Sequence, residues 1–203
     1  MMVKIAPTDH PIHALISDRW SPYGFTDRKV APEDLRSLFE AARWAPSCYN
    51  EQPWRFIVAT SDDAPGFARL LSCLVDANQA WARHAPVLAL GVARRTFTRN
   101  DRVNRHALYD LGQAVANLSV EATERGLAVH QMGGILPERA RELYLVPDEF
   151  EIVTGIAIGH AGAGTDLPDD YRQRDATPRV RSSLESFVFA DRWEVAAGMV
   201  VDD

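Results

Sequence analysis

Cysteine and lysine are scarce in this chain of 203 residues. The cysteines Cys48 and Cys73 provide neither a disulfide framework nor a zinc-binding pattern, so a reduced, cytoplasmic protein is expected. Lys4 and Lys29 stand beside twenty arginines. Positive charge in a binding site must therefore come mainly from planar guanidinium groups, which are well suited to phosphate.

Long apolar runs, excess basic charge and the common nucleotide and nucleophile motifs are absent as well. The longest apolar run, residues 85–93, is about half of a membrane span, and residues 1–17 lack the apolar core of a signal peptide. The formal charge of −6 argues against a general nucleic-acid binder. No GxGxxG, Walker or GxSxG motif occurs, and His10 and His13 have no further metal ligands nearby. A Rossmann dinucleotide-binding domain, a serine hydrolase and a metal centre are therefore disfavoured.

Hydrophobic periodicity, with proline and glycine as punctuation, predicts one α+β domain over residues 1–203. The predicted helix over 32–44 begins at a proline and carries an apolar stripe at helical spacing. The run over 86–93 is typical of a strand buried on both faces. Further helices are predicted over 11–18, 106–125 and 137–144 and after a cap at Asp62 or Asp63; further strands are predicted over 55–60, 127–132 and 152–159. The pattern favours a small sheet surrounded by helices.

The segment Ala45 to Trp54, APSCYNEQPW, separates a predicted helix from a predicted strand. Its two prolines restrict the backbone, and Ser47, Asn50 and Gln52 add neutral hydrogen-bonding groups. Such a loop often binds a ligand, but it is equally consistent with a helix exit followed by a polar turn. Cys48 within it has no basic neighbour in sequence, so ordinary packing is favoured over a nucleophilic thiol.

Two glycines and three arginines are the other candidates for a binding site. Gly133 and Gly134 follow a predicted strand, either as turn residues or as a place where backbone N–H groups approach a ligand. Arg19, Arg179 and Arg181 lie in irregular segments. Each guanidinium could donate two parallel hydrogen bonds to a phosphate, or remain a solvated charge.

In their order along the chain, these segments resemble the FMN-dependent nitroreductase family from about residue 12 to residue 188. Arg19-Trp20-Ser21-Pro22-Tyr23 is similar to the family's N-terminal phosphate-binding segment. Residues 46–54 are similar to its Pro-Ser-(Ser)-x-Asn-x-Gln-Pro-Trp loop. The remaining matches are Asn78 near the flavin pyrimidine, Gly126-Leu127 and Met132-Gly133-Gly134 beside the isoalloxazine, and Arg179 and Arg181 at the phosphate.

The resemblance implies an α-β-α sandwich with a small mixed sheet, in an obligate homodimer with two FMN sites at the subunit interface. A C-terminal segment is expected to wrap across the partner. The small-residue surface of the helix over 106–125, which otherwise fits core packing, becomes a dimer element. Arg19, Ser21, Arg179 and Arg181 of one subunit are expected to hold the phosphate and ribityl oxygens, and the other subunit is expected to contribute Pro46, Ser47, Cys48 and Asn50. The further residues expected to bind the cofactor are Trp20, Tyr23, Asn78, Met132, Gly133 and Gly134.

The resemblance also implies an NAD(P)H oxidoreductase that reduces nitroaromatics, quinones or related acceptors. Hydride transfer would be ping-pong through flavin N5, where Gly133 presents its backbone N–H, and no side chain need act as an acid because the cofactor carries the chemistry. The alternatives are a flavin-dependent dehydrogenase or dehalogenase on the same scaffold, and a non-enzymatic FMN-binding sensor or storage protein.

Two aromatic residues depart from the family pattern. Tyr23 stands where an arginine or lysine is common, and Trp81 stands where some members carry a lysine. Arg83 or a helix N-terminus is a candidate for the missing positive charge. Together with Trp20 and His130, these rings could instead line an aromatic pocket, although core packing is favoured for each ring taken singly.

Overall fold

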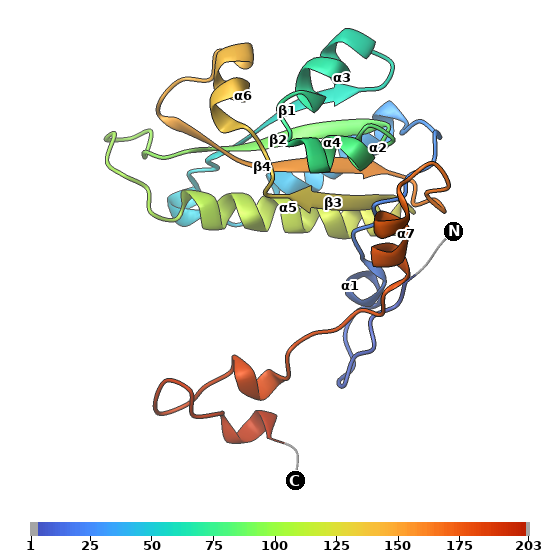
Figure 1. Cartoon of the computed structure of the whole chain (residues 1–203). Helices are drawn as coiled ribbons and strands as arrows, with labels where there is room; N and C mark the ends of the chain where they lie inside the picture. The colour runs from blue at the N-terminus through green and yellow to red at the C-terminus, as the bar shows by residue number, and fades with distance from the viewer. Residues whose placement is uncertain (1–3, 202–203) are drawn as a thin grey trace.

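The computed structural model describes residues 4–201, which build a four-stranded sheet with helices on both faces (Figure 1). The strands are β1 (Trp54–Thr60), β2 (Val87–Arg94), β3 (Ala128–Met132) and β4 (Phe150–Gly159). The helices are α1 (Ala14–Asp18), α2 (Pro32–Arg43), α3 (Ala64–Leu71), α4 (Asp76–Ala82), α5 (Ala107–Glu124), α6 (Pro137–Tyr144) and α7 (Asp169–Ala176). Short 3₁₀ helices are η1 (Cys48–Asn50), η2 (Leu184–Ser186) and η3 (Gly198–Val200). No helix within residues 4–201 is long and apolar enough to cross a membrane.

The sheet has the strand order β1-β2-β4-β3, and its three pairings are antiparallel. The expected mixed sheet is therefore wrong for the described part of the chain. β2 and β3 run in the same direction and are joined through α5, but β4 lies between them and pairs with both. β3 is consequently an edge strand with one unpaired side.

The core is divided by the sheet into two layers, and this confirms the α-β-α sandwich. Along β2, Leu88 and Leu90 pack into the layer under α3, α4 and α6. The alternate residues Val87 and Ala89 pack into the layer under α2 and α5. The period-two alternation of strand side chains fills both layers from one strand, which explains why its sequence is apolar throughout.

Two helices have no counterpart in the sequence-based prediction. α4 is only seven residues long, and α7 lies partly in a segment whose glycine, proline and aspartate content predicts a loop. α7 buries a single residue, Tyr171, whose hydroxyl donates to the carbonyl oxygen of Ala77 at 2.6 Å. Because α7 is held by this one contact and has no apolar stripe, hydrophobic periodicity does not predict it.

The long helix α5 spans 18 residues and packs against α2. Its small residues divide between two environments: Ala114 and Ser119 are buried, whereas Gly112 and Ala116 are exposed. A Cβ added to Gly112 would meet no atom within 4 Å. Some small residues of α5 therefore pack in the core, and others lie on its exposed surface.

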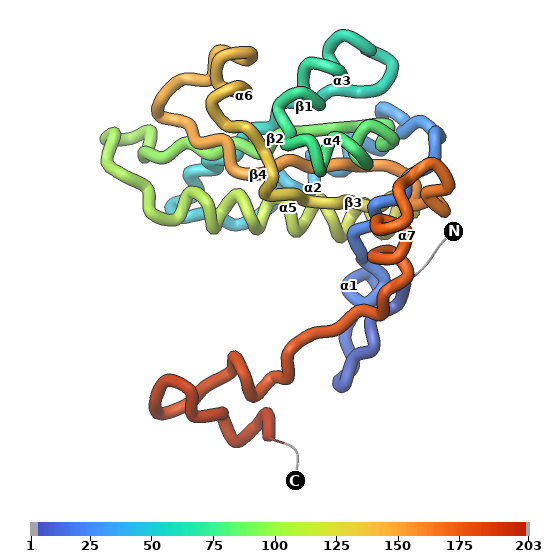
Figure 2. Tube along the Cα trace, viewed as in Figure 1, coloured from blue at the N-terminus to red at the C-terminus, as the bar shows by residue number. Residues whose placement is uncertain are grey.

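After α7 the chain leaves the body of the molecule as an extended arm, residues 177–201 (Figure 2). A bridge between Phe189 and Ala196 closes a local turn, in which the rings of Phe189 and Trp193 pack at 5.2 Å. Trp193 and Met199 are 82% and 89% exposed. The arm thus holds large apolar side chains away from the core of its own chain.

Candidate functional site

Three guanidinium groups predicted to act together lie close to one another. Burial lowers the pKa of Arg19 below its ordinary value, and the positive charges of Arg179 and Arg181 lower it further. The Arg19 Nη1 donates to the Ser21 hydroxyl at 3.2 Å. Within residues 4–201, none of the three arginines forms an ion pair with a carboxylate. The Asp18 carboxylate lies near Arg179 but forms no ion pair with it, so three guanidiniums against one carboxylate leave a net positive charge that is suited to binding an anion.

The start of the arm is fixed to the N-terminal segment by hydrogen bonds. The Asp175 carboxylate accepts the backbone N–H groups of Tyr23 and Gly24 at 2.9 Å. Arg179 Nη1 donates to the carbonyl oxygens of Lys4 and Ser17, at 2.7 and 2.5 Å. These contacts oppose the mutual repulsion of the guanidiniums and explain how they are held together.

The glycine pair lies at the far end of the edge strand β3. The Asn78 side-chain amide donates to the Gly134 carbonyl at 2.9 Å, and a Cβ on Gly134 would come within 2.5 Å of that amide nitrogen. A Cβ on Gly133 would meet nothing within 4 Å. Met132 is buried and pairs with Gly155. Gly134 is therefore required for packing, whereas Gly133 borders open space.

Tyr23 and Trp81, the two residues that depart from the family pattern, form a packed cluster with His130. The ring of Tyr23 lies 5.2 Å from that of Trp81 and 4.7 Å from that of His130. Burial lowers the pKa of His130, while its Nδ1 lies 2.9 Å from the Pro22 carbonyl oxygen. Trp81 is fully buried, so core packing, rather than an open pocket, describes these rings.

Trp20, the fourth proposed pocket ring, and Arg83, the candidate for the missing positive charge, do not belong to this cluster. Trp20 is buried, with the Lys4 ammonium 5.5 Å from its ring centre. Arg83 is exposed and donates from Nε to the Gln79 carbonyl in its own helix, α4. The structure therefore gives no sign that Arg83 replaces the missing charge.

The loop between α2 and β1 has an unusual backbone. Tyr49, Asn50 and Gln52 all have positive φ, at 53°, 56° and 50°, a conformation that costs energy for residues other than glycine. The Gln52 N–H donates to the Ser47 hydroxyl at 3.0 Å. The Cys48 N–H donates to the buried carboxylate of Asp110 in α5, also at 3.0 Å. The prolines and these bonds hold a strained shape, with Pro46 exposed at its start.

This loop and the arginines lie toward opposite ends of α5. Asp110, which holds the loop, is in the first turn of the helix, whereas Arg19 and Thr123 line one cavity near its last turn. Thirteen residues at 1.5 Å each separate Asp110 from Thr123 by about 20 Å. One chain therefore carries two groups of the predicted residues, well separated from each other.

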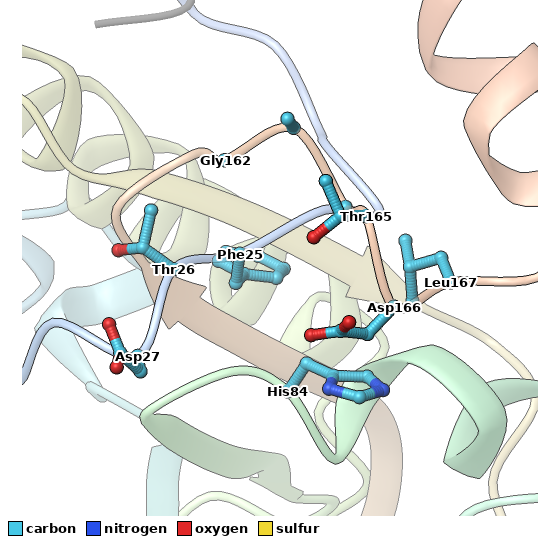
Figure 3. A pocket seen from close by; sticks show the side chains of 10 residues that line it. Phe25, Thr26, Asp27, His84, Gly162, Thr165, Asp166 and Leu167 are labelled. Atoms are coloured by element: carbon cyan, nitrogen blue, oxygen red, sulfur yellow. The ribbon is translucent and has the colours of Figure 1, made fainter.

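Two cavities complete the description of this region. The one beside Arg19 has a volume of about 330 Å³. The other, of about 280 Å³, is lined by residues 25–27, by His84 and by residues 162–167, and includes the side chains of Asp27, His84 and Asp166 (Figure 3). With two carboxylates and a single imidazole, the second cavity is unsuited to an anionic ligand.

Asp110 and Asp175 are the functional residues that sequence reasoning missed. Each is an acidic residue within a helix, where a solvated charge is the ordinary interpretation. Only their backbone partners, 62 and 152 residues away in sequence, distinguish them from surface carboxylates. No local pattern carries that information.

Comparison with known proteins identifies the family. The nitroreductase family model matches residues 16–160. A Streptomyces coelicolor protein with the provisional name NADH dehydrogenase/NAD(P)H nitroreductase is 38% identical over 166 residues, which cover 72% of this chain and 81% of that protein. The major NAD(P)H-flavin oxidoreductase of Aliivibrio fischeri is 43% identical over 127 residues, 59% of this chain and 53% of that protein.

Among solved structures, an oxidoreductase containing FMN superimposes with a TM-score of 0.87 at 33% identity. The superposition covers 93% of this chain and 96% of that one. The sequence motifs, the family model and the fold agree, and this chain belongs to the nitroreductase family.

Proposed function

We propose that this chain is an FMN-dependent NAD(P)H oxidoreductase that works as a homodimer. The observation that carries the proposal is the group formed by Arg19, Arg179 and Arg181, in which three guanidiniums face one nearby carboxylate, Asp18, and form no ion pair among the described residues. Each can donate paired hydrogen bonds to a phosphate. Family membership and the similarity to an FMN-containing oxidoreductase support the proposal that this phosphate is the phosphate group of FMN.

The residues present fit this cofactor in two further respects. The edge strand β3 begins at Ala128, in the cavity beside Arg19, and leads to the glycine pair, about 17 Å away. Gly133 leaves open space there, where a flat ring system can lie against the backbone. Asn78 is fixed beside it by its bond to Gly134.

When bound, FMN accepts a hydride from NAD(P)H and passes electrons to an acceptor such as a nitroaromatic or a quinone. This chain's own residues bind and orient: the arginines and Ser21 hold the phosphate end, and Trp20 and Tyr23 of the same N-terminal segment pack behind it. Met132 packs beside the glycine pair, at the ring end. The Gly133 backbone, which borders open space, would lie beside the reacting part of the ring. Residues 1–203 act as one FMN-binding domain, and the free thiols of Cys48 and Cys73 support a cytoplasmic location.

A second copy of the chain supplies the rest of the site. Pro46, Ser47, Cys48 and Asn50 lie about 20 Å along α5 from the arginines of their own chain, and in this proposal they face the flavin of the partner subunit. The exposed Gly112 and Ala116 on α5 permit close approach of another helix. The apolar side chains of the arm, Trp193 and Met199 above all, would be covered by that copy.

The absorption spectrum of the purified protein, before and after FMN is added, tests the cofactor. A yellow protein that retains FMN through gel filtration is expected, and sedimentation should give twice the chain mass. Anaerobic addition of NADH or NADPH should bleach the flavin, and nitrobenzene or a quinone should restore its colour. A protein that stays colourless contradicts FMN binding; flavin that neither nucleotide bleaches contradicts the oxidoreductase but not the binding site.

A further inference from the structure

We infer that a second surface, made by Tyr49, Phe97, Arg99, Arg102 and Arg105, binds the 2′-phosphorylated adenosine end of NADPH and makes NADPH the preferred electron donor. This surface is called the arginine platform below. The inference rests on the proposed function, because it concerns the donor of the same flavin site.

The platform begins with a stack of planar groups. The guanidinium carbon of Arg99 lies 4.1 Å from the ring centre of Tyr49 and 5.3 Å from that of Phe97. The two rings themselves meet edge to face at 5.9 Å. Tyr49 is 73% exposed, so much of its ring remains open to solvent. An adenine ring can stack on such a surface, because it is planar and π-rich like the side chains already there.

Two further arginines, Arg102 and Arg105, are exposed in the same loop as Arg99. In the part of the chain that the structure describes, Arg99, Arg102 and Arg105 form no ion pair. Of the nearby carboxylates, Asp101 pairs with Arg94 and Glu151 pairs with Arg95. Glu51 accepts the Thr98 N–H and keeps its charge, so three guanidiniums remain against one carboxylate.

Three side-chain nitrogen donors in or next to this loop are buried. Arg94 Nε, Arg95 Nε and Asn104 Nδ2 are buried without a hydrogen-bond acceptor among the described residues, and all three lie in or next to the same loop. These enclosed atoms do not reach the surface, and Arg94 and Arg95 are ion-paired, so the donors available to an anion are the exposed guanidiniums of the platform.

The position of the platform connects it to the flavin site. Tyr49 lies between Cys48 and Asn50, the loop residues that the proposed function sets against the flavin of the partner subunit. The loop 95–105 is attached to this segment through the bond from the Thr98 N–H to Glu51, at 2.6 Å, and through the contact of Phe97 with Tyr49. The platform is thus at the rim of that site, where the end of the donor distant from its nicotinamide would extend.

The chemistry of the platform favours NADPH over NADH. The two donors differ only by the 2′-phosphate, and the guanidiniums of Arg99, Arg102 and Arg105 can each offer it paired donors. NADH leaves these charges without a partner, so it gains only the stacking on Tyr49. Discrimination between the donors therefore depends on the arginines, and general affinity for adenine depends on the tyrosine.

The test compares the wild-type holoenzyme with Arg99→Ala, Arg102→Ala and Arg69→Ala. Arg69 is an exposed arginine of α3, on the opposite face of the sheet from α5. Its replacement by alanine removes the same positive charge far from the platform, and therefore serves as the control for net charge. The KM for NADPH should rise roughly tenfold in Arg99→Ala and severalfold in Arg102→Ala, with the KM for NADH changing less than twofold. Arg69→Ala should leave both values unchanged.

A binding measurement supplies a readout that does not depend on flavin reduction. Calorimetry of the holoenzyme should show that 2′,5′-ADP binds at least tenfold more tightly than 5′-AMP, and that Arg99→Ala removes this preference. Equal binding of the two nucleotides by the wild type, or equal changes in both KM values, would overturn the inference. A holoenzyme that is bleached equally well by NADH and NADPH would contradict the platform while leaving the proposed function intact; no bleaching by either would contradict the proposed function.

Discussion

Near the C-terminal end of α5 the candidate site carries strong positive charge, whereas the loop residues near its N-terminal end that are assigned to the flavin, Pro46, Ser47, Cys48 and Asn50, are neutral. The charged region joins Arg19 to Arg179 and Arg181, which are far apart in sequence, and depends on long-range bonds such as that of Asp175 to Tyr23. The loop, residues 46–53, is contiguous in sequence, and Tyr49, Asn50 and Gln52 have positive φ. Its one charged side chain, Glu51, accepts the Thr98 N–H.

The two regions show two ways of preparing a binding surface. Like charges repel, so they must be held by contacts that the rest of the fold provides. Neutral groups need no such restraint, but they require a defined backbone shape, which prolines and one buried carboxylate supply. In the proposed dimer the two regions, from different copies, meet at one flavin.

The charged region should show the largest effect of substitution. Arg19→Ala combined with Arg181→Ala removes two charge-assisted contacts and should weaken FMN binding by about a hundredfold or more, as measured by fluorescence titration. Arg69→Ala is the control for net charge. Arg179→Ala should weaken binding as well, but it also loses the bonds to Lys4 and Ser17. Undiminished FMN retention in the double variant would show that these arginines do not hold the phosphate.

The glycine pair offers a matched comparison between packing and binding. Gly134→Ala forces a methyl group against Asn78 and should lower the free energy of unfolding by about 1–3 kcal/mol, as measured by urea denaturation. Gly133→Ala should leave the apoprotein's stability within about 0.5 kcal/mol of wild type, because its Cβ meets open space, but should weaken FMN binding. Equal effects of the two substitutions on unfolding would contradict this division.

At the neutral end, Asp110 is expected to support the loop. Asp110→Ala leaves the Cys48 N–H without its acceptor and should cost about 1–3 kcal/mol of unfolding free energy. Asp110→Asn keeps a carbonyl oxygen in place and should recover much of this loss. If both variants were as stable as the wild type, the loop would not depend on this bond.

The smallest expected effect concerns pH. Burial holds the pKa of His130 below its ordinary value of 6.5, so between these two pKa values the unfolded chain binds more protons than the folded one. The free energy of unfolding should therefore fall as the pH drops below about 6.5, and this slope should flatten in His130→Phe. Urea denaturation at pH 7.5 and 5.5 measures it, with the exposed His10→Gln as the control. An identical slope in His130→Phe would assign the pH dependence to other groups, such as His160.

Much of the fold follows from local sequence. The alternation along β2 and the proline start of α2 predict these elements close to their observed bounds, because strand and helix periods are properties of a few neighbouring residues. The short α4 and the nearly unburied α7 escape prediction, since each depends on a tertiary contact rather than on a stripe. The prediction of a mixed sheet is wrong because β4 lies between β2 and β3, which run in the same direction, and pairs antiparallel with both. Which strands become neighbours is decided by tertiary contacts.

By itself, the sequence determined the types of groups available to the site: twenty arginines, a proline-bounded polar loop and a glycine pair. It also determined the family, through motifs in a fixed order. Only the tertiary structure decided that Arg19 joins Arg179 and Arg181, that Asp110 and Asp175 act as acceptors for distant N–H groups, and that the loop lies about 20 Å along α5 from the arginines. The physical reason is range: residue chemistry and periodicity are local, whereas convergence of charges and burial of their partners depend on contacts that form only when the whole chain has folded.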